Sequence, residues 1–168
     1  MRWPVLAFAL GCSHREPAAP PPRWATVAVP ECHAELELPG TVTREVETAD
    51  DPPTILYETA GDDHLLATCI AYPPDAELPI DEEVLRGAIK HQHSALDDLA
   101  GGIESSKQTI APDAHSASYE LHFRSGQVIA GTLRLAGREL ANISAIVSAP
   151  GGETALERAV ASYHRLAR

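Results

Sequence analysis

The chain has 168 residues, a length typical of one folded domain. Its content of 44% hydrophobic and 22% charged residues excludes a disordered tail or a collagen-like chain. The 24 acidic and 13 basic residues give a formal net charge of −11, and a body this acidic repels phosphate backbones. We therefore expect no nucleic acid among its partners.

The N-terminus has the order of a secretory signal: a positive charge at Arg2, an apolar run from Trp3 to Leu10, and then small residues. The run is too short to span a bilayer. The segment Ala9-Leu10-Gly11-Cys12 resembles the lipobox of bacterial lipoproteins, whose cysteine is acylated and becomes the first residue after cleavage. The resemblance implies a lipid on Cys12 and loss of residues 1–11. A cytosolic protein with an irregular apolar start is the alternative.

The segment from Glu16 to Arg23 is rich in proline and is predicted to be an extended, polyproline-type spacer. The predicted organisation is thus a signal peptide over 1–11, a lipidated cysteine and tether over 12–24, and one domain over 25–168. The expected location is the bacterial cell envelope, with the domain facing the periplasm or the cell exterior.

The first half of the domain is predicted to contain three strands. Residues 34–38 alternate between apolar and acidic side chains, which indicates a strand with one buried face, and Pro39-Gly40 ends it. Residues 54–59 and 64–72 are predicted to form a hairpin around Gly61-Asp62-Asp63.

A helix is predicted to begin at Asp81, which would cap it, and to end before Gly101-Gly102. Its expected apolar face consists of Leu85, Ile89, Gln92, Leu96 and Leu99.

The second half is predicted to be a short strand near 103–110 and a meander near 115–124, 127–135 and 139–147, with tight turns at Ser125-Gly126 and Gly137-Arg138. A final helix should start with a capping box over 154–157, and its apolar stripe is Leu156, Val160 and Tyr163. Short turns join consecutive strands, and two amphipathic helices must bury their stripes. The predicted fold class is therefore α+β, an antiparallel sheet with two packed amphipathic helices.

The order of elements, together with three short motifs, resembles the PsbP-like fold over residues 32–166. The motifs are Leu38-Pro39-Gly40, Tyr72-Pro73 and the segment from Tyr119 to Phe123. This fold occurs in extrinsic proteins of photosystem II and in many bacterial lipoproteins. The resemblance implies an α/β sandwich without enzyme activity, whose members largely bind or assist other proteins, and it transfers no functional residue.

Common catalytic signatures are missing from the sequence, which has no G-x-S-x-G, H-E-x-x-H, C-x-x-C, P-loop or G-x-G-x-x-G motif. Neither a catalytic residue nor a cofactor is predicted. The paired carboxylates Asp50-Asp51, Asp62-Asp63 and Asp97-Asp98 are interpreted as solvated turn residues. The sequon Asn142-Ile143-Ser144 lies in the middle of a predicted strand and is interpreted as coincidence.

Eight histidines raise the question of a metal site. His91 and His93 are two apart on a predicted helix, and His115 and His122 are seven apart on one strand, so neither pair shares a face. No metal site is therefore predicted. A metal or enzyme site would need His33, His64, His115 and His122, at least three of them converging on one point.

Cys32 and Cys69 both lie in predicted strands and would meet an oxidising compartment after export. A disulfide and a pair of buried free thiols are equally good alternatives, because pairing in space is not visible from sequence.

The expected function is that of a lipid-anchored envelope protein that binds a partner protein or assists an assembly without catalysis. The lipid is its only expected contact with the membrane. The alternatives are an envelope hydrolase with a site built from scattered His, Ser and Asp residues, and a histidine-based metal-binding module.

Overall fold

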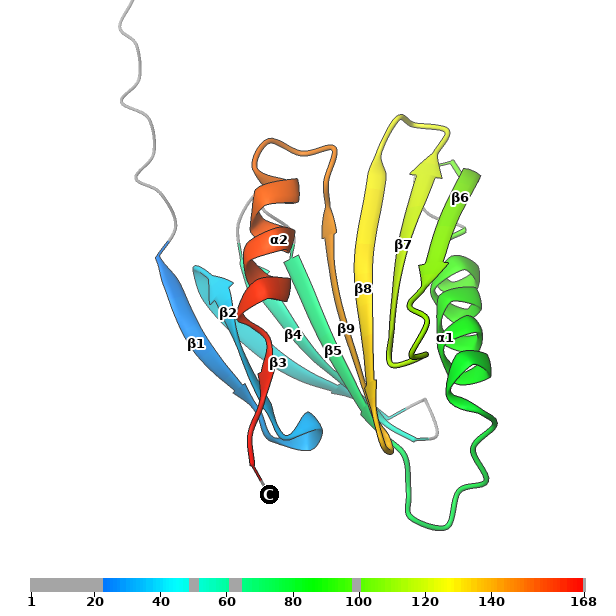
Figure 1. Cartoon of the computed structure of the whole chain (residues 1–168). Coiled ribbons are helices and arrows are strands. Elements are labelled where there is room, and N and C mark those ends of the chain that lie inside the picture. Colours follow the sequence, from blue (N-terminus) through cyan, green and yellow to red (C-terminus); the bar gives the residue numbers. More distant parts are fainter. Residues whose placement is uncertain (1–22, 49–51, 61–64, 98–100, 168) are drawn as a thin grey trace, which may run out of the picture.

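The computed structural model describes residues 23–48, 52–60, 65–97 and 101–167. The elements of this part of the chain are, in order, β1 (Trp24–Val29), the 3-10 turn η1 (Pro30–Cys32), β2 (Ala34–Pro39), β3 (Thr41–Glu47), β4 (Thr54–Ala60), β5 (Leu65–Ala71), α1 (Asp81–Leu96), β6 (Ile103–Ile110), β7 (Ser116–Phe123), β8 (Val128–Ala136), β9 (Glu139–Ile146), α2 (Gly152–Ser162) and β10 (His164–Arg165) (Figure 1).

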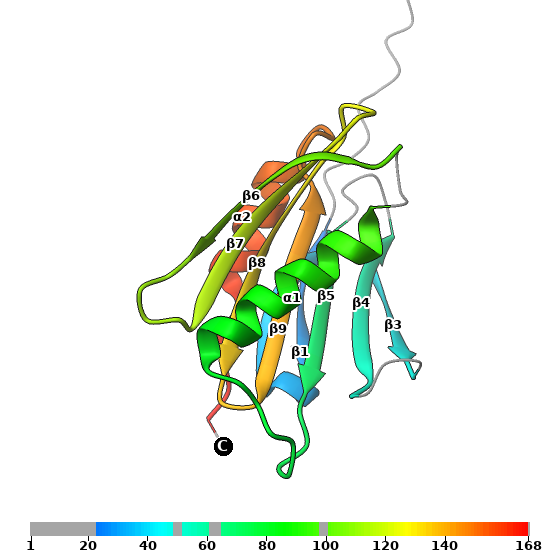
Figure 2. The ribbon, with the colours of Figure 1, turned by 90° about the vertical axis from the view of Figure 1, so that its right-hand side faces the viewer.

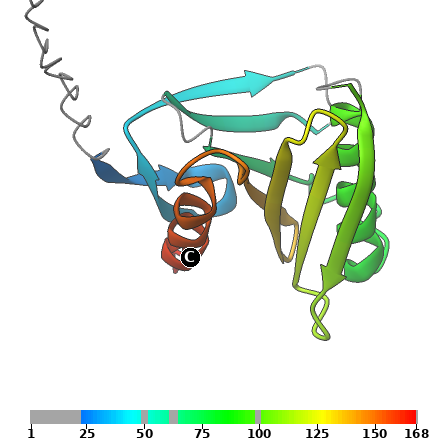
Figure 3. The same cartoon turned by 90° about the horizontal axis from the view of Figure 1, so that it is seen from above.

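Across the described residues the strands form two antiparallel sheets. The large sheet has the order β3-β4-β5-β9-β8-β7-β6, and the small sheet has the order β1-β2-β10. Helix α2 packs between β2 of the small sheet and β9 of the large sheet, whereas α1 packs on β6, β7 and β8. The two helices lie on opposite sides of the large sheet (Figures 2 and 3). The predicted α+β class, with two helices packed on antiparallel sheets, is confirmed.

An apolar core lies on each face of the large sheet. The first core fills the space between this sheet, α2 and the small sheet, and it includes Leu36, Leu65 and Ile143. The second core lies under α1 and includes Leu85 and Leu121. Strand β9 contributes to both cores and is buried along nearly its whole length, because both of its faces are covered.

The predicted hairpin and meander are confirmed, with β4 and β5 paired and β7, β8 and β9 consecutive neighbours in the sheet. Three strands were missed: β1, β3 and the two-residue β10, which pairs with β2. Strand β1 begins at Trp24, one residue before the predicted start of the domain, and pairs with β2 along its whole length. Strand β3 is an edge strand whose side chains are largely exposed, so its sequence carries little apolar alternation.

Both predicted helix caps are wrong. The N-cap of α1 is Ile80 and no side chain caps it; the Asp81 carboxylate lies 3.4 Å from His115 Nδ1 instead. The buried face of α1 consists of Val84, Leu85 and Ile89, and the predicted face residue Leu99 lies outside the described residues.

Helix α2 begins at Gly152, two residues before the predicted capping box, and Gly151 is its N-cap with a φ of 85°. Its fully buried stripe consists of Gly152, Ala155 and Ala159, while the predicted stripe residues are only partly buried. A Cβ on Gly152 would lie 2.1 Å from the backbone oxygen of Ile146. Small residues therefore let the helix approach β9 closely, and the larger apolar side chains flank the contact.

Among the described residues, no helix has the length and apolar character needed to cross a membrane.

Candidate functional site

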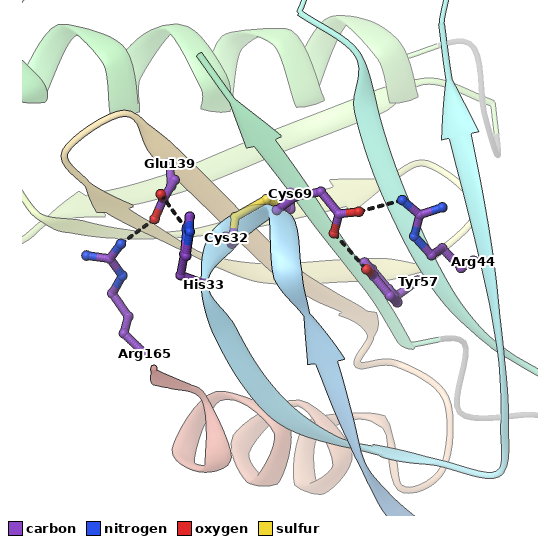
Figure 4. Close-up of a disulfide and its surroundings, with 8 residues drawn as sticks. Cys32, His33, Arg44, Tyr57, Cys69, Glu139 and Arg165 are labelled. Atoms are coloured by element: carbon purple, nitrogen blue, oxygen red, sulfur yellow. Dashed lines mark hydrogen bonds and ion pairs between the residues drawn. A yellow bond between two sulfur atoms is a disulfide. The ribbon is translucent and has the colours of Figure 1, made fainter. Parts of the chain in front are cut away.

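The two cysteines left open by the sequence are bonded to each other in the structure, and the Cys32 and Cys69 Cα atoms are 6.0 Å apart (Figure 4). Both cysteines are fully buried in the first core. Cys69 lies in β5 as expected, but Cys32 ends the turn η1 and does not lie in a strand. Because η1 reverses the chain between β1 and β2, the bond ties the tip of that hairpin to β5, an inner strand of the large sheet.

A cluster of polar side chains holds one side of this turn. Arg44 of β3 and Tyr57 of β4 both donate hydrogen bonds to the Glu31 carboxylate, with Tyr57 Oη 2.9 Å from Glu31 Oε2. Partial burial by itself would raise the pKa of Glu31, but the hydrogen bonds from Arg44 and Tyr57 outweigh it and hold that pKa below its ordinary value of 4.5.

A second cluster holds the other side of the turn. His33 Nδ1 lies 2.8 Å from Glu139 Oε1, and Arg165 of β10 pairs with the other oxygen of the same carboxylate. The backbone N–H of Leu166 also donates to the His33 carbonyl at 2.7 Å. These contacts attach β10 to the turn, so the surroundings of the disulfide connect the small sheet, including β10, to the large sheet (Figure 4).

The histidines that a metal or enzyme site would need do not come together in the described part of the chain. Each of the three that are described faces its own carboxylate: His33 faces Glu139, His115 faces Asp81, and His122 faces Glu120. His64 lies outside the described residues. Among the described side chains, no group of three His, Cys, Asp or Glu residues could hold a metal ion.

The paired aspartates mostly lie outside the described residues, which include only Asp97 of the three pairs. Asp97 Oδ1 accepts a hydrogen bond from the Ile103 N–H at 3.2 Å, so it connects the end of α1 to the start of β6. The sequon residues Asn142 and Ser144 are 3% and 6% exposed within β9. Asn142 is thus a buried residue of the sheet.

A cavity of about 260 Å³ lies between α1 and the sheet face that α1 covers. Gly87 and Ala88 form part of its helix side, and Ile70, Leu140 and Asn142 form part of its sheet side. Sequence reasoning missed this cavity, because it depends on how the helix crosses the strands (Figure 2). The available signal was a polar Asn142 inside an otherwise apolar strand.

A hydrogen bond inside the second core fixes the Asn142 side chain. Tyr119 Oη donates to Asn142 Oδ1 at 3.2 Å. Burial raises the pKa of Tyr119, and its hydrogen bonds with Asn142 and Ser144 oppose that rise only in part, so the phenol stays protonated at neutral pH. Gly131 makes this arrangement feasible, because a Cβ there would lie 2.4 Å from Tyr119 Cζ. Asn142 Nδ2 is buried and has no hydrogen-bond partner among the described residues.

No model of a known protein family matches the sequence, and no curated protein matches it. The structure is similar to the solution structure of cyanobacterial PsbP (CyanoP) from Synechocystis sp. PCC 6803, with a TM-score of 0.53 and 8% sequence identity. The match covers 89% of this chain and 95% of that chain. At this identity the likeness concerns the fold alone. The chain therefore has a PsbP-like fold, an α+β arrangement of two helices packed on antiparallel sheets.

Proposed function

We propose that this protein is a non-catalytic binding protein of the bacterial cell envelope, anchored to a membrane by a lipid on Cys12. The observation that carries the proposal is the buried Cys32–Cys69 disulfide. Disulfides form and persist in oxidising compartments such as the periplasm and the cell exterior and are rare in the cytosol. The bond therefore supports export, and the lipobox-like sequence before Cys12 supports the anchor.

The arrangement of titratable side chains favours binding over catalysis. A hydrolase needs a nucleophile, a base and an orienting group within hydrogen-bond distance of one another. In the described residues, His33, His115 and His122 each face a separate carboxylate, two of which come from other elements. These contacts leave the three imidazoles apart. We expect the partner to be another protein of the envelope, which this protein binds or helps to assemble.

Fractionation of cells tests the anchor. The wild-type protein should sediment with membranes and enter solution only with detergent, and its mature form should lack residues 1–11. Cys12→Ser should move the protein to the soluble fraction. The double variant Cys32→Ala with Cys69→Ala is the matched control, because it also removes cysteines but should stay with the membranes. Wild-type protein found in the soluble fraction with residues 1–11 attached would contradict the proposal.

Cross-linking in intact cells tests the binding role. The wild-type protein should give a discrete cross-linked species that Cys12→Ser reduces, because release from the membrane dilutes the protein away from an anchored partner. Purified protein should show no turnover of ester, peptide or phosphate substrates. Turnover that His122→Ala abolishes while the fold is retained would instead support the hydrolase.

A further inference from the structure

The cavity under α1 has the features of a ligand site that goes beyond the partner-binding role. It lies between the covered sheet face and a stretch of helix with little side-chain bulk. Gly87 has no side chain, and a Cβ built on it would meet no atom within 4 Å. Ala88 contributes one methyl group beside it. The space therefore exists because these two helix positions are small, and a larger side chain there would reduce it.

The walls of the cavity favour an uncharged, mainly apolar occupant. Ile70, Leu133 and Leu140 contribute aliphatic surface from three neighbouring strands. Among the described lining residues there is no Asp, Glu, Lys or Arg. His91 and Gln92 add polar groups on the helix side, but a charged ligand would lose its hydration here without meeting a carboxylate, an ammonium or a guanidinium group, which is costly. An aliphatic cavity of about 150 Å³ binds benzene, so about 260 Å³ suits a molecule of about ten non-hydrogen atoms.

One polar group on the sheet side lacks a partner. Asn142 is 3% exposed, and its Oδ1 accepts the hydrogen bond from Tyr119. That bond orients the amide and leaves Nδ2 as a buried donor without a described partner. An unsatisfied buried donor costs about 1 to 3 kcal/mol. A ligand that offers an acceptor to Nδ2 would recover this cost, whereas an apolar ligand of the same shape would not.

We propose that the cavity between α1 and the sheet binds a small, neutral, mainly apolar molecule whose carbonyl-type oxygen accepts a hydrogen bond from Asn142 Nδ2. The aliphatic walls provide affinity, and the amide selects for the acceptor. Thr68, which is paired with Asn142 across β5 and β9, lies beside it in the lining. The ligand class is thus defined by size, lack of charge and one acceptor.

Two probes of equal shape test the role of the amide. Acetophenone carries a carbonyl where α-methylstyrene carries a methylene group. Each is titrated into the full chain carrying Cys12→Ser, which prevents acylation, and ¹H–¹⁵N spectra follow the Asn142 side-chain signal. Acetophenone should shift that signal and bind about tenfold more tightly than α-methylstyrene, because only acetophenone pairs the buried donor. In Asn142→Leu combined with Tyr119→Phe, which leaves no buried hydroxyl donor in place of the amide, the ratio should fall to about one, with both probes still bound.

A second pair of variants tests the place of binding. Gly87→Leu puts a large side chain beside the cavity and should weaken both probes about tenfold or more, whereas Gly87→Ala should change them less than about threefold. Both substitutions replace glycine with a good helix former, so they are matched in their effect on the helix. If the double variant Asn142→Leu with Tyr119→Phe does not fold, the two Gly87 variants and the two probes still test the proposal. Equal affinity of the wild type for the two probes overturns the proposal, and so does binding that Gly87→Leu leaves unchanged or the absence of any binding.

Discussion

Breaking the Cys32–Cys69 bond should remove a large share of the stability of the domain. The bond joins residues 37 apart in sequence, and the chain-entropy relation gives about 4 kcal/mol for a loop of this length. A domain typically has only about 5 to 15 kcal/mol in total. Both sulfur atoms lie in the first core, so Cys32→Ala with Cys69→Ala removes the bond without introducing a buried polar group.

Urea and thermal unfolding measure this loss. For a domain of this size, about 4 kcal/mol corresponds to a fall in Tm of about 8 to 16 °C. Reductant should lower the Tm of the wild-type protein by a similar amount. Hydrogen exchange should localise the effect: amides of β1 and β2 should exchange faster, because the bond attaches that hairpin to β5. Strands β7 and β8 pack under α1, so their amides should keep most of their protection from hydrogen exchange.

The double alanine variant is also the control, because reductant should leave its Tm unchanged. Thiol titration of the wild-type protein before and after reductant establishes that the bond was present and was broken. If complete reduction lowers the free energy of unfolding by less than about 1 kcal/mol, the loop-closure reasoning is refuted. A uniform rise in exchange over both cores would refute the assignment of the effect to the β1–β2 hairpin.

Four further substitutions test the packing and the electrostatics. Gly152→Ala should lower the free energy of unfolding by more than about 2 kcal/mol, because its Cβ would lie 2.1 Å from the Ile146 oxygen. Gly87→Ala, with open space around it, should raise the free energy of unfolding by about 0.5 to 1 kcal/mol. Urea unfolding compares the two variants, and equal effects would contradict the close approach of α2 to β9. Glu31 has a lowered pKa, so its ion pair stabilises the fold above pH 4.5 and this contribution is lost as the pH falls through the folded-state pKa. Glu31→Gln should therefore lower the free energy of unfolding by about 0.5 to 1 kcal/mol at neutral pH, a small value because the pair is solvent-exposed. The difference from the wild type should vanish in acid. A difference that does not depend on pH would exclude the carboxylate as its source. Asn142→Leu removes the acceptor of the buried Tyr119 hydroxyl and should lower the free energy of unfolding by about 1 to 3 kcal/mol. Adding Tyr119→Phe removes that unpaired hydroxyl and should recover part of the loss, and no recovery would contradict the hydrogen bond between the two side chains.

The sequence predicted most of the secondary structure because local patterns determine it. Alternation in residues 34–38 identified β2, and the glycines at 126 and 137, both with positive φ, identified the turns of the meander. Strand β3 gave no such signal, because an edge strand is held by backbone hydrogen bonds to one neighbour and its side chains stay in solvent. Strand β1 follows a proline-rich segment, and its pairing with β2 is a contact that its own composition does not indicate.

The sequence by itself therefore determined the fold class, the positions of the two helices and the acidity of the surface. Only the tertiary structure decided which side chains meet. Cys32 and Cys69 come together because η1 places the tip of one hairpin over β5 of the other sheet. Asn142 lines a cavity because α1 crosses the sheet with Gly87 and Ala88 toward it. Hydrophobic periodicity specifies which face of an element is buried, but the element that covers this face is chosen by packing between segments far apart in the chain.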